Sequence, residues 1–180
     1  NEKQLQAELE RQADIYQALG IQKDVIMRLT PPKDIPIKYT HCVVTLGSSV
    51  DLQRQADFAG IYIDQNVLKA RDVAGGITYP RPHLIYIYDG GDFKGKTAKW
   101  VRENVNGLER PSTIADVIAL GITHPDSLKL ILQHHNIDAP GSICGDEWVP
   151  NVTVFEGFYS INARLDSEDK SEFGSALSFG

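Results

Sequence analysis

The chain has 180 residues, of which 42% are hydrophobic and 23% are charged, which is the composition of an ordinary globular domain. A chain of this length can bury a sizeable core without a disulfide or a bound metal. Its formal net charge of −6 and its isoelectric point near 5.3 exclude the general basic character that attracts nucleic acid or anionic lipid. Its apolar runs are all shorter than the roughly 18 residues of a membrane span, so we expect neither nucleic acid nor a membrane as a partner.

The N-terminal part is predicted to be helical. Residues 2–19 carry apolar side chains at three- and four-residue steps, which indicates an amphipathic helix, and a second short helix is expected over residues 23–29. The proline pair that begins at Pro31 then marks an extended connector. We therefore expect residues 1–180 to form a single domain, with residues 1–32 as its helical N-terminal segment.

The next elements are two predicted strands separated by a helix. Residues 41–46 form an apolar, β-branched run, and residues 83–88 form a second run of the same kind. Between them, Ser48 and Asp51 have the spacing of a capping pair and predict the start of a short helix. A further helix is expected over residues 98–105.

A helix pair is the clearest local signal in the chain. Thr113 and Asp116 have the spacing of a capping box at the start of a helix that runs to about residue 122. Pro125 then restarts a helix after a connection of only two residues. These two helices are predicted to form an αα-hairpin.

The C-terminal third changes to a period of two. The segments "NVTVFE" and "YSINARL" alternate in polarity on either side of Gly157, and "FGSALSFG" could return as a third strand. This pattern predicts an antiparallel β-meander. Taken together, the elements predict an α+β fold with a helical N-terminal part, a small mixed or antiparallel sheet, an αα-hairpin and a C-terminal antiparallel β-meander.

Residues 88–97, "YDGGDFKGKT", contain the Walker A spacing. Gly90, Gly95, Lys96 and Thr97 occupy its fixed positions. In a phosphate-binding loop the backbone N–H groups point at the phosphates, the lysine reaches the terminal ones and the hydroxyl binds Mg²⁺. A nucleotide- or phosphate-binding protein that uses these four residues is therefore one alternative for the function.

The residues inside this loop favour a structural role instead. Asp92 would place a carboxylate within an anion-binding loop, and the bulky Phe93 suits a turn that packs an aromatic ring inward. A phosphate-binding domain of this class also needs buried parallel strands after the motif, whereas the strands predicted here alternate in polarity. We therefore expect a turn after the strand, with Thr97 as the N-cap of the following helix.

The two cysteines, Cys42 and Cys144, are expected to be reduced thiols of a cytoplasmic protein. Cys144 lies between Asp146 and the pair His134 and His135, but their spacing matches no zinc motif, so we expect no metal and no cofactor.

A thiol-dependent enzyme is the second alternative for the function. Cys144 would become a candidate nucleophile if His41 or His83 lay beside it, because a nucleophilic thiol needs a base within hydrogen-bond reach. Otherwise Cys144 is expected to be a buried, inert thiol.

The C-terminal part resembles a bacterial domain family that has no assigned activity. Here "RPSTIADVIALGITHPDSL" is followed by "PGSICGDEWVPNVTVF" and by a terminal "FGSALSFG", a sequence that is similar to a capped helix and a Gly-Ser-x-Cys-Gly-Asp-x-x-Val-Pro loop in that family. The matching positions are Gly141, Ser142, Cys144, Gly145, Asp146, Val149 and Pro150, followed by Gly174, Ser175 and Ala176. The chain departs from the family pattern near its end, where "NARLDSEDKSE" stands in place of a Trp-rich stretch.

This resemblance implies a single bacterial intracellular domain and implies no activity. It directs attention to Ser142, Cys144 and Asp146 as residues that could hold an unknown ligand. Because the sequence brings no catalytic set together, we expect a soluble, cytoplasmic binding or structural module without catalysis. A homo-oligomer and an unidentified small molecule are its expected partners.

Overall fold

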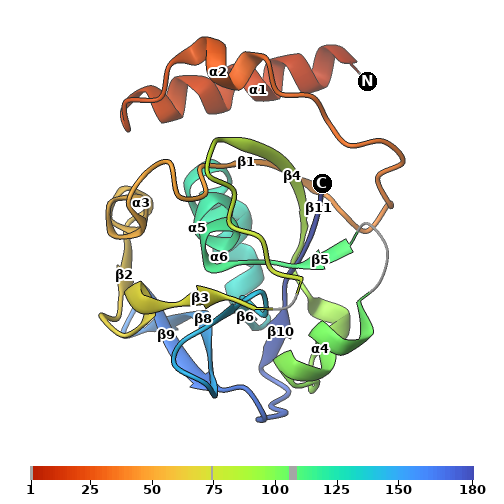
Figure 1. Cartoon of the computed structure of the whole chain (residues 1–180), viewed down its shortest axis with the longest axis vertical. Coiled ribbons are helices and arrows are strands. Elements are labelled where there is room, and N and C mark those ends of the chain that lie inside the picture. Colours follow the sequence, from red (N-terminus) through yellow and green to blue (C-terminus); the bar gives the residue numbers. More distant parts are fainter. Residues whose placement is uncertain (1, 74, 106–108) are drawn as a thin grey trace.

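The computed structural model describes residues 2–73, 75–105 and 109–180 and has the predicted α+β architecture (Figure 1). The α-helices of this part are α1 (Glu2–Gln17), α2 (Lys23–Met27), α3 (Leu52–Ala59), α4 (Ala98–Asn104), α5 (Ile114–Thr123) and α6 (Pro125–Leu132). Short 3-10 helices lie at η1 (Val67–Lys69) and η2 (Gly91–Phe93). The strands are β1 (His41–Thr45), β2 (Ile61–Ile63), β3 (Arg71–Asp72), β4 (His83–Tyr88), β5 (Glu109–Pro111), β6 (Asn136–Asp138), β7 (Ser142–Ile143), β8 (Trp148–Phe155), β9 (Phe158–Leu165), β10 (Phe173–Ser175) and β11 (Leu177–Phe179).

These strands form two main sheets and one short pair. The first sheet has the order β1-β4-β11-β5, and all of its neighbouring strands are antiparallel. The second sheet has the order β10-β6-β8-β9-β2 and is mixed, because β10 pairs with β6 and β2 pairs with β9 in parallel. Strands β3 and β7 form a separate antiparallel pair.

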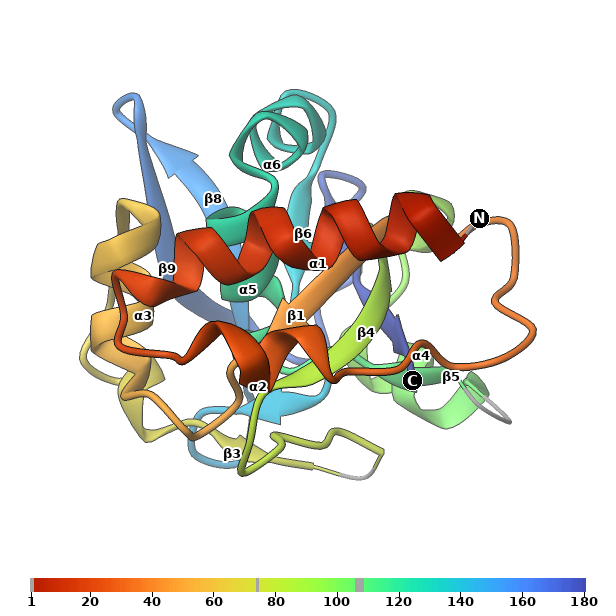
Figure 2. The same ribbon diagram turned by 90° about the horizontal axis from the view of Figure 1, so that it is seen from above.

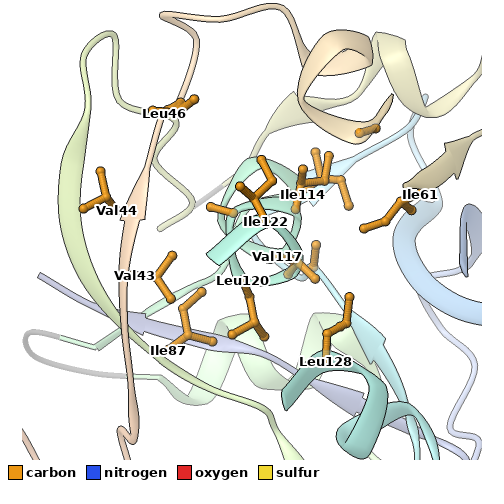
Figure 3. Packing of buried hydrophobic residues seen from close by; sticks show 14 of the residues in the cluster. Val43, Val44, Leu46, Ile61, Ile87, Ile114, Val117, Leu120, Ile122 and Leu128 are labelled. Carbon is orange, nitrogen blue, oxygen red and sulfur yellow. The ribbon is translucent and has the colours of Figure 1, made fainter. Parts of the chain in front are cut away.

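Helix α5 forms the centre of the core. All ten of its residues are buried, and it contacts β1 of the first sheet and β8 of the second. Figure 3 shows the helix between Val43 and Ile87 on one side and Ile61 on the other. Each fully buried aliphatic side chain of this kind contributes about 1.5–3 kcal/mol to the free energy of unfolding, so this helix is a main source of stability.

The predicted capping box begins α5. The Thr113 hydroxyl accepts the N–H of Asp116, and the Asp116 carboxylate accepts the N–H of Thr113 at 2.9 Å. The same carboxylate accepts a hydrogen bond from Nη1 of the buried Arg110 at 2.7 Å. The box therefore satisfies the first amides of the helix and also neutralises a buried guanidinium.

The C-terminal strands follow the prediction as far as the β8–β9 hairpin. The two strands are antiparallel, and the turn between them contains Glu156 and Gly157, both with positive φ. After the hairpin the structure differs from the predicted meander. Strand β10 pairs in parallel with β6, and β11 lies between β4 and β5 in the first sheet. Residues 174–179 are all buried, so this segment, which contributes β10 to one sheet and β11 to the other, has no solvent-exposed face of the kind that a meander strand has.

Candidate functional site

A hollow of about 470 Å³ opens beside Cys144. Its lining brings together residues from three separate segments, namely Asp64, Asn66, Lys69, Cys144, Gly145, Trp148, Asn162 and Ala163. The parallel pairing of β2 with β9 places Ile63 beside Ile161 and explains part of this set. Both strands run in the same direction, so the residues that follow the pair, Asp64 and Asn162, reach the same side of the sheet.

The polar side chains of the hollow have hydrogen-bond donors and acceptors that are not used within the protein. One oxygen of Asp64 accepts the N–H of Asn66 at 2.7 Å, and the Asn162 amide donates to Ser160 Oγ at 2.9 Å. Within the part of the chain that the structure describes, the Lys69 ammonium and the Asn66 side-chain amide have no protein partner. The hollow therefore offers a carboxylate oxygen, an ammonium group and amide groups to a ligand.

The Cys144 thiol is buried in the wall of this hollow, with 5% of the residue exposed. Its backbone N–H donates to the carbonyl of Trp148 at 2.7 Å and so closes the turn at Gly145. Burial raises the pKa of the thiol to about 11, and the negative charge of Asp64 acts in the same direction. At neutral pH the sulfur is therefore a protonated, weakly polar group.

The histidines considered as bases lie elsewhere. The His41 ring packs against the His124 ring at a centroid distance of 5.6 Å, and the His83 ring stacks on Tyr79 at 3.8 Å. Neither histidine lines the hollow. The described residues thus provide no histidine base for Cys144.

Ser142 and Asp146 do not join Cys144 in the hollow. The Ser142 hydroxyl accepts the N–H of Ile114 at 3.0 Å and so helps to cap α5. Asp146 is exposed and forms an ion pair of 3.3 Å with Arg71. The loop over residues 141–150 therefore places only one of its three predicted ligand residues, Cys144, in this cavity.

The Gly90–Thr97 loop uses its backbone N–H groups within the protein. The amide of Gly91 donates to the Asp89 carboxylate at 2.9 Å, and that of Asp92 donates to the Tyr88 hydroxyl at 2.8 Å. The amide of Phe93 donates to the carbonyl of Gly90 at 2.8 Å. These three backbone N–H groups therefore already donate hydrogen bonds within the protein and are not free to bind a phosphate.

The side chains of this loop also have partners in the protein. Thr97 is the N-cap of α4, as expected, because its hydroxyl accepts the N–H of Trp100 at 2.9 Å. The Lys96 ammonium lies 4.9 Å from the centroid of the Trp100 ring, and the Lys94 ammonium donates to the carbonyl of His134. The arrangement is that of a turn and a helix start, and phosphate binding by Gly90, Gly95, Lys96 and Thr97 stays a prediction.

Most residues of the hollow cannot be recognised from the sequence. Asp64, Asn66, Lys69 and Asn162 come together only in the fold, because the pairing of β2 with β9 joins segments about 100 residues apart in sequence. The available signal was the polar run that begins at Asp64 directly after the short apolar stretch "IYI". Polar residues at the end of a parallel strand are a common form of binding site.

Two further properties concern the part of the chain that the structure describes. Across residues 2–73, 75–105 and 109–180, no three His, Cys, Asp or Glu side chains are grouped so that they could hold a metal ion. In the same residues no helix has both the length and the apolar character needed to cross a bilayer.

Comparison of the chain with protein-family models, with curated proteins and with solved structures gives no match in any of the three.

Proposed function

We propose that the chain is a binding module without catalysis, which takes a small, hydroxyl-rich molecule such as a monosaccharide in the hollow beside Cys144. The observation that carries this proposal is the set of polar side chains with unused hydrogen-bonding capacity around one cavity. The cavity volume of about 470 Å³ lies within the range of small-molecule sites.

The lining supports a ligand that is neutral overall and carries hydroxyl groups. Asp64 and Lys69 bring opposite charges, so the walls do not select strongly for an anion or a cation. The amides of Asn66 and Asn162 can each donate and accept hydrogen bonds, as hydroxyl groups also do. The ring of Trp148 adds an apolar surface for the C–H groups of such a molecule.

The state of the thiol supports binding over catalysis. A nucleophilic cysteine requires a lowered pKa or an adjacent base, and Cys144 has a raised pKa and no histidine in the hollow. The proposal also includes a cytoplasmic, bacterial setting. Its support is that Cys42 and Cys144 are both free thiols and that the loop around Cys144 resembles the bacterial family described above.

Titration with a panel of monosaccharides tests the proposal, with tryptophan fluorescence as the first readout. Trp148 and Trp100 are exposed to similar extents, 46% and 39%, so Trp148→Phe should remove the signal while Trp100→Phe keeps it. Isothermal calorimetry of the sugar that gives a signal then measures affinity. Asn162→Ala and Lys69→Ala should each weaken binding about tenfold, which corresponds to the loss of one ligand hydrogen bond.

The matched control is Lys129→Ala, because Lys129 is an exposed lysine of α6 outside the hollow. Equal weakening by Lys129→Ala and Lys69→Ala, or the absence of heat and fluorescence change with every sugar, would contradict the proposal. ATP and GTP with Mg²⁺ belong in the same panel. Binding of a nucleotide that is lost in Lys96→Ala and kept in Lys69→Ala would support the phosphate alternative instead.

A further inference from the structure

One end of the second sheet carries three exposed aromatic side chains on its outer surface. Tyr62, Phe155 and Phe158 are 65%, 66% and 73% exposed. Phe155 is paired with Phe158 across the hairpin, and Tyr62 is paired with Ser160, two residues further along β9. Because side chains alternate along a strand, all three project from the same face of the sheet. We call these three residues the aromatic face.

The aromatic face is uncovered although the opposite surface of the same strands is part of the core. Ile61 and Ile161 are 2% and 0% exposed on the side that faces α5. Further along β9 the outer surface is covered as well, since Arg164 is buried and forms an ion pair with Asp138. The exposure is therefore confined to the end of the sheet at the hairpin.

The aromatic face borders a shallow hollow that is free of charge. The hollow has a volume of about 390 Å³ and is lined by Gly60, Tyr62, Phe155, Phe158, Tyr159 and Ser160. The lining contains no Asp, Glu, Lys or Arg, so the hollow has no charge pattern that would select a basic or an acidic partner. Two copies of such a surface can therefore meet without bringing like charges of the lining together.

The exposed area fits a contact between two copies. Aromatic side chains bury about 150–250 Å² each, so three that are about two-thirds exposed offer roughly 400 Å² per copy. Two such faces together bury roughly 800 Å², which is the size of a weak, reversible contact and less than a tightly bound dimer needs. A two-fold arrangement would use the same surface on both copies, as is usual for homodimers.

We propose that the aromatic face is the contact surface of a homodimer, in which Phe155 and Phe158 of one copy pack against the same residues of the other. Glu156, the charged and exposed residue of the hairpin turn, remains in solvent at the edge of this contact. The aromatic face shares no residue with the lining of the hollow beside Cys144.

Sedimentation equilibrium at protein concentrations from about 1 to 200 μM tests this inference. The wild-type chain should pass from monomer to dimer in this range, and the equilibrium should change little between low and high salt, since the contact is apolar. Phe158→Ser should weaken the dimer about 30-fold or more, as expected for a central aromatic residue of an interface. Phe155→Ser should have a similar effect.

The matched control is Leu130→Ser, because Leu130 is 57% exposed on α6 and lies outside the aromatic face. It should leave the dimer unchanged. Far-UV circular dichroism and the melting temperature at low concentration verify that each variant is folded. A wild-type chain that stays monomeric at all concentrations would overturn the inference. So would a dimer that both phenylalanine variants leave intact, which would place the contact elsewhere.

Discussion

The side-chain amide of Gln12 accepts a hydrogen bond from the backbone N–H of Val44 at 2.7 Å and donates one to the carbonyl of Cys42 at the same distance. Strand β1 is the last strand of its sheet, so these backbone groups have no neighbouring strand to pair with. The Tyr16 hydroxyl donates to the carbonyl of Val44 at 2.6 Å. Helix α1, which crosses over β1 in Figure 2, thus takes the place of a further strand and closes the edge of the sheet.

Replacing Gln12 by alanine should lower the free energy of unfolding by about 2–4 kcal/mol, because two buried backbone groups lose their partners. Urea unfolding followed by circular dichroism measures this change. Gln6→Ala is the control, since Gln6 is an exposed residue of the same helix. If both variants lose the same free energy of unfolding, the loss reflects a weaker helix α1 and not unpaired groups at the edge of the sheet.

The stability of the protein should fall on mild acidification because of His124. Burial lowers the pKa of His124 to about 4; Arg11 and His41 act in the same direction, and Glu8 opposes them. In the unfolded chain the pKa is about 6.5. The unfolded state therefore binds the proton first, so this stabilisation is complete above about pH 6.5 and is lost as the pH falls toward 4.

The replacement His124→Asn should remove this part of the pH dependence. The ring is partly exposed, so we expect the wild-type chain to lose about 1–2 kcal/mol more than the variant between pH 7.5 and pH 4.5. Urea unfolding at both pH values measures the difference, and carboxyl groups common to both chains cancel. His134→Asn, at an exposed histidine, should keep the wild-type dependence. Identical pH profiles for His124→Asn and the wild type would show that the idea is wrong.

Two glycines of the Walker A pattern should respond differently to alanine. Gly90 and Gly95 both have positive φ, 82° and 74°, so both replacements share a backbone cost of about 1–2 kcal/mol. A Cβ at Gly90 would lie 2.2 Å from the carbonyl oxygen of Ser175, whereas a Cβ at Gly95 has no heavy atom within 4 Å. Gly90→Ala should therefore cost about 1–3 kcal/mol more, as a lower melting temperature in calorimetry shows. Equal losses at the two positions would argue against the packing role of Gly90.

Iodoacetamide should modify the native protein very slowly at pH 7.5. The pKa of Cys144 and that of Cys42 are both raised to about 11, chiefly by burial, and the thiolate is the reactive form. Mass spectrometry of the native and urea-unfolded chains measures the modification, and the unfolded chain should be labelled at both positions. Fast labelling of native Cys144 alone would favour the thiol-dependent enzyme.

Elements with a strong local signal could be predicted from the sequence. The run at residues 83–88 coincides with β4, and the capping box of Thr113 and Asp116 begins α5. The turn at Gly157 joins the predicted hairpin strands. In each case neighbouring residues determine the geometry, so a window of a few residues contains the necessary information.

Features that depend on distant partners could not be predicted. Strands β2 and β6 have three residues each, too few for a period to appear, and their pairing decides which loops meet. The sequence marks Cys144 as a candidate through the glycines and polar residues of its own loop. Asp64 and Asn162 reach the hollow only through the β2–β9 pairing. For the same reason, the sequence does not predict the position of β11 between β4 and β5.

Helix α5 has a consequence for the motions of the protein. It is hydrophobic on all sides and has only ten residues, too few for a stable isolated helix in water. Its order therefore depends on the strands and helices that surround it. Its backbone amides can reach solvent only when the sheets on either side of it separate, so they should be among the last to exchange their hydrogens for deuterium, and their exchange rates should report the rarest opening of the molecule.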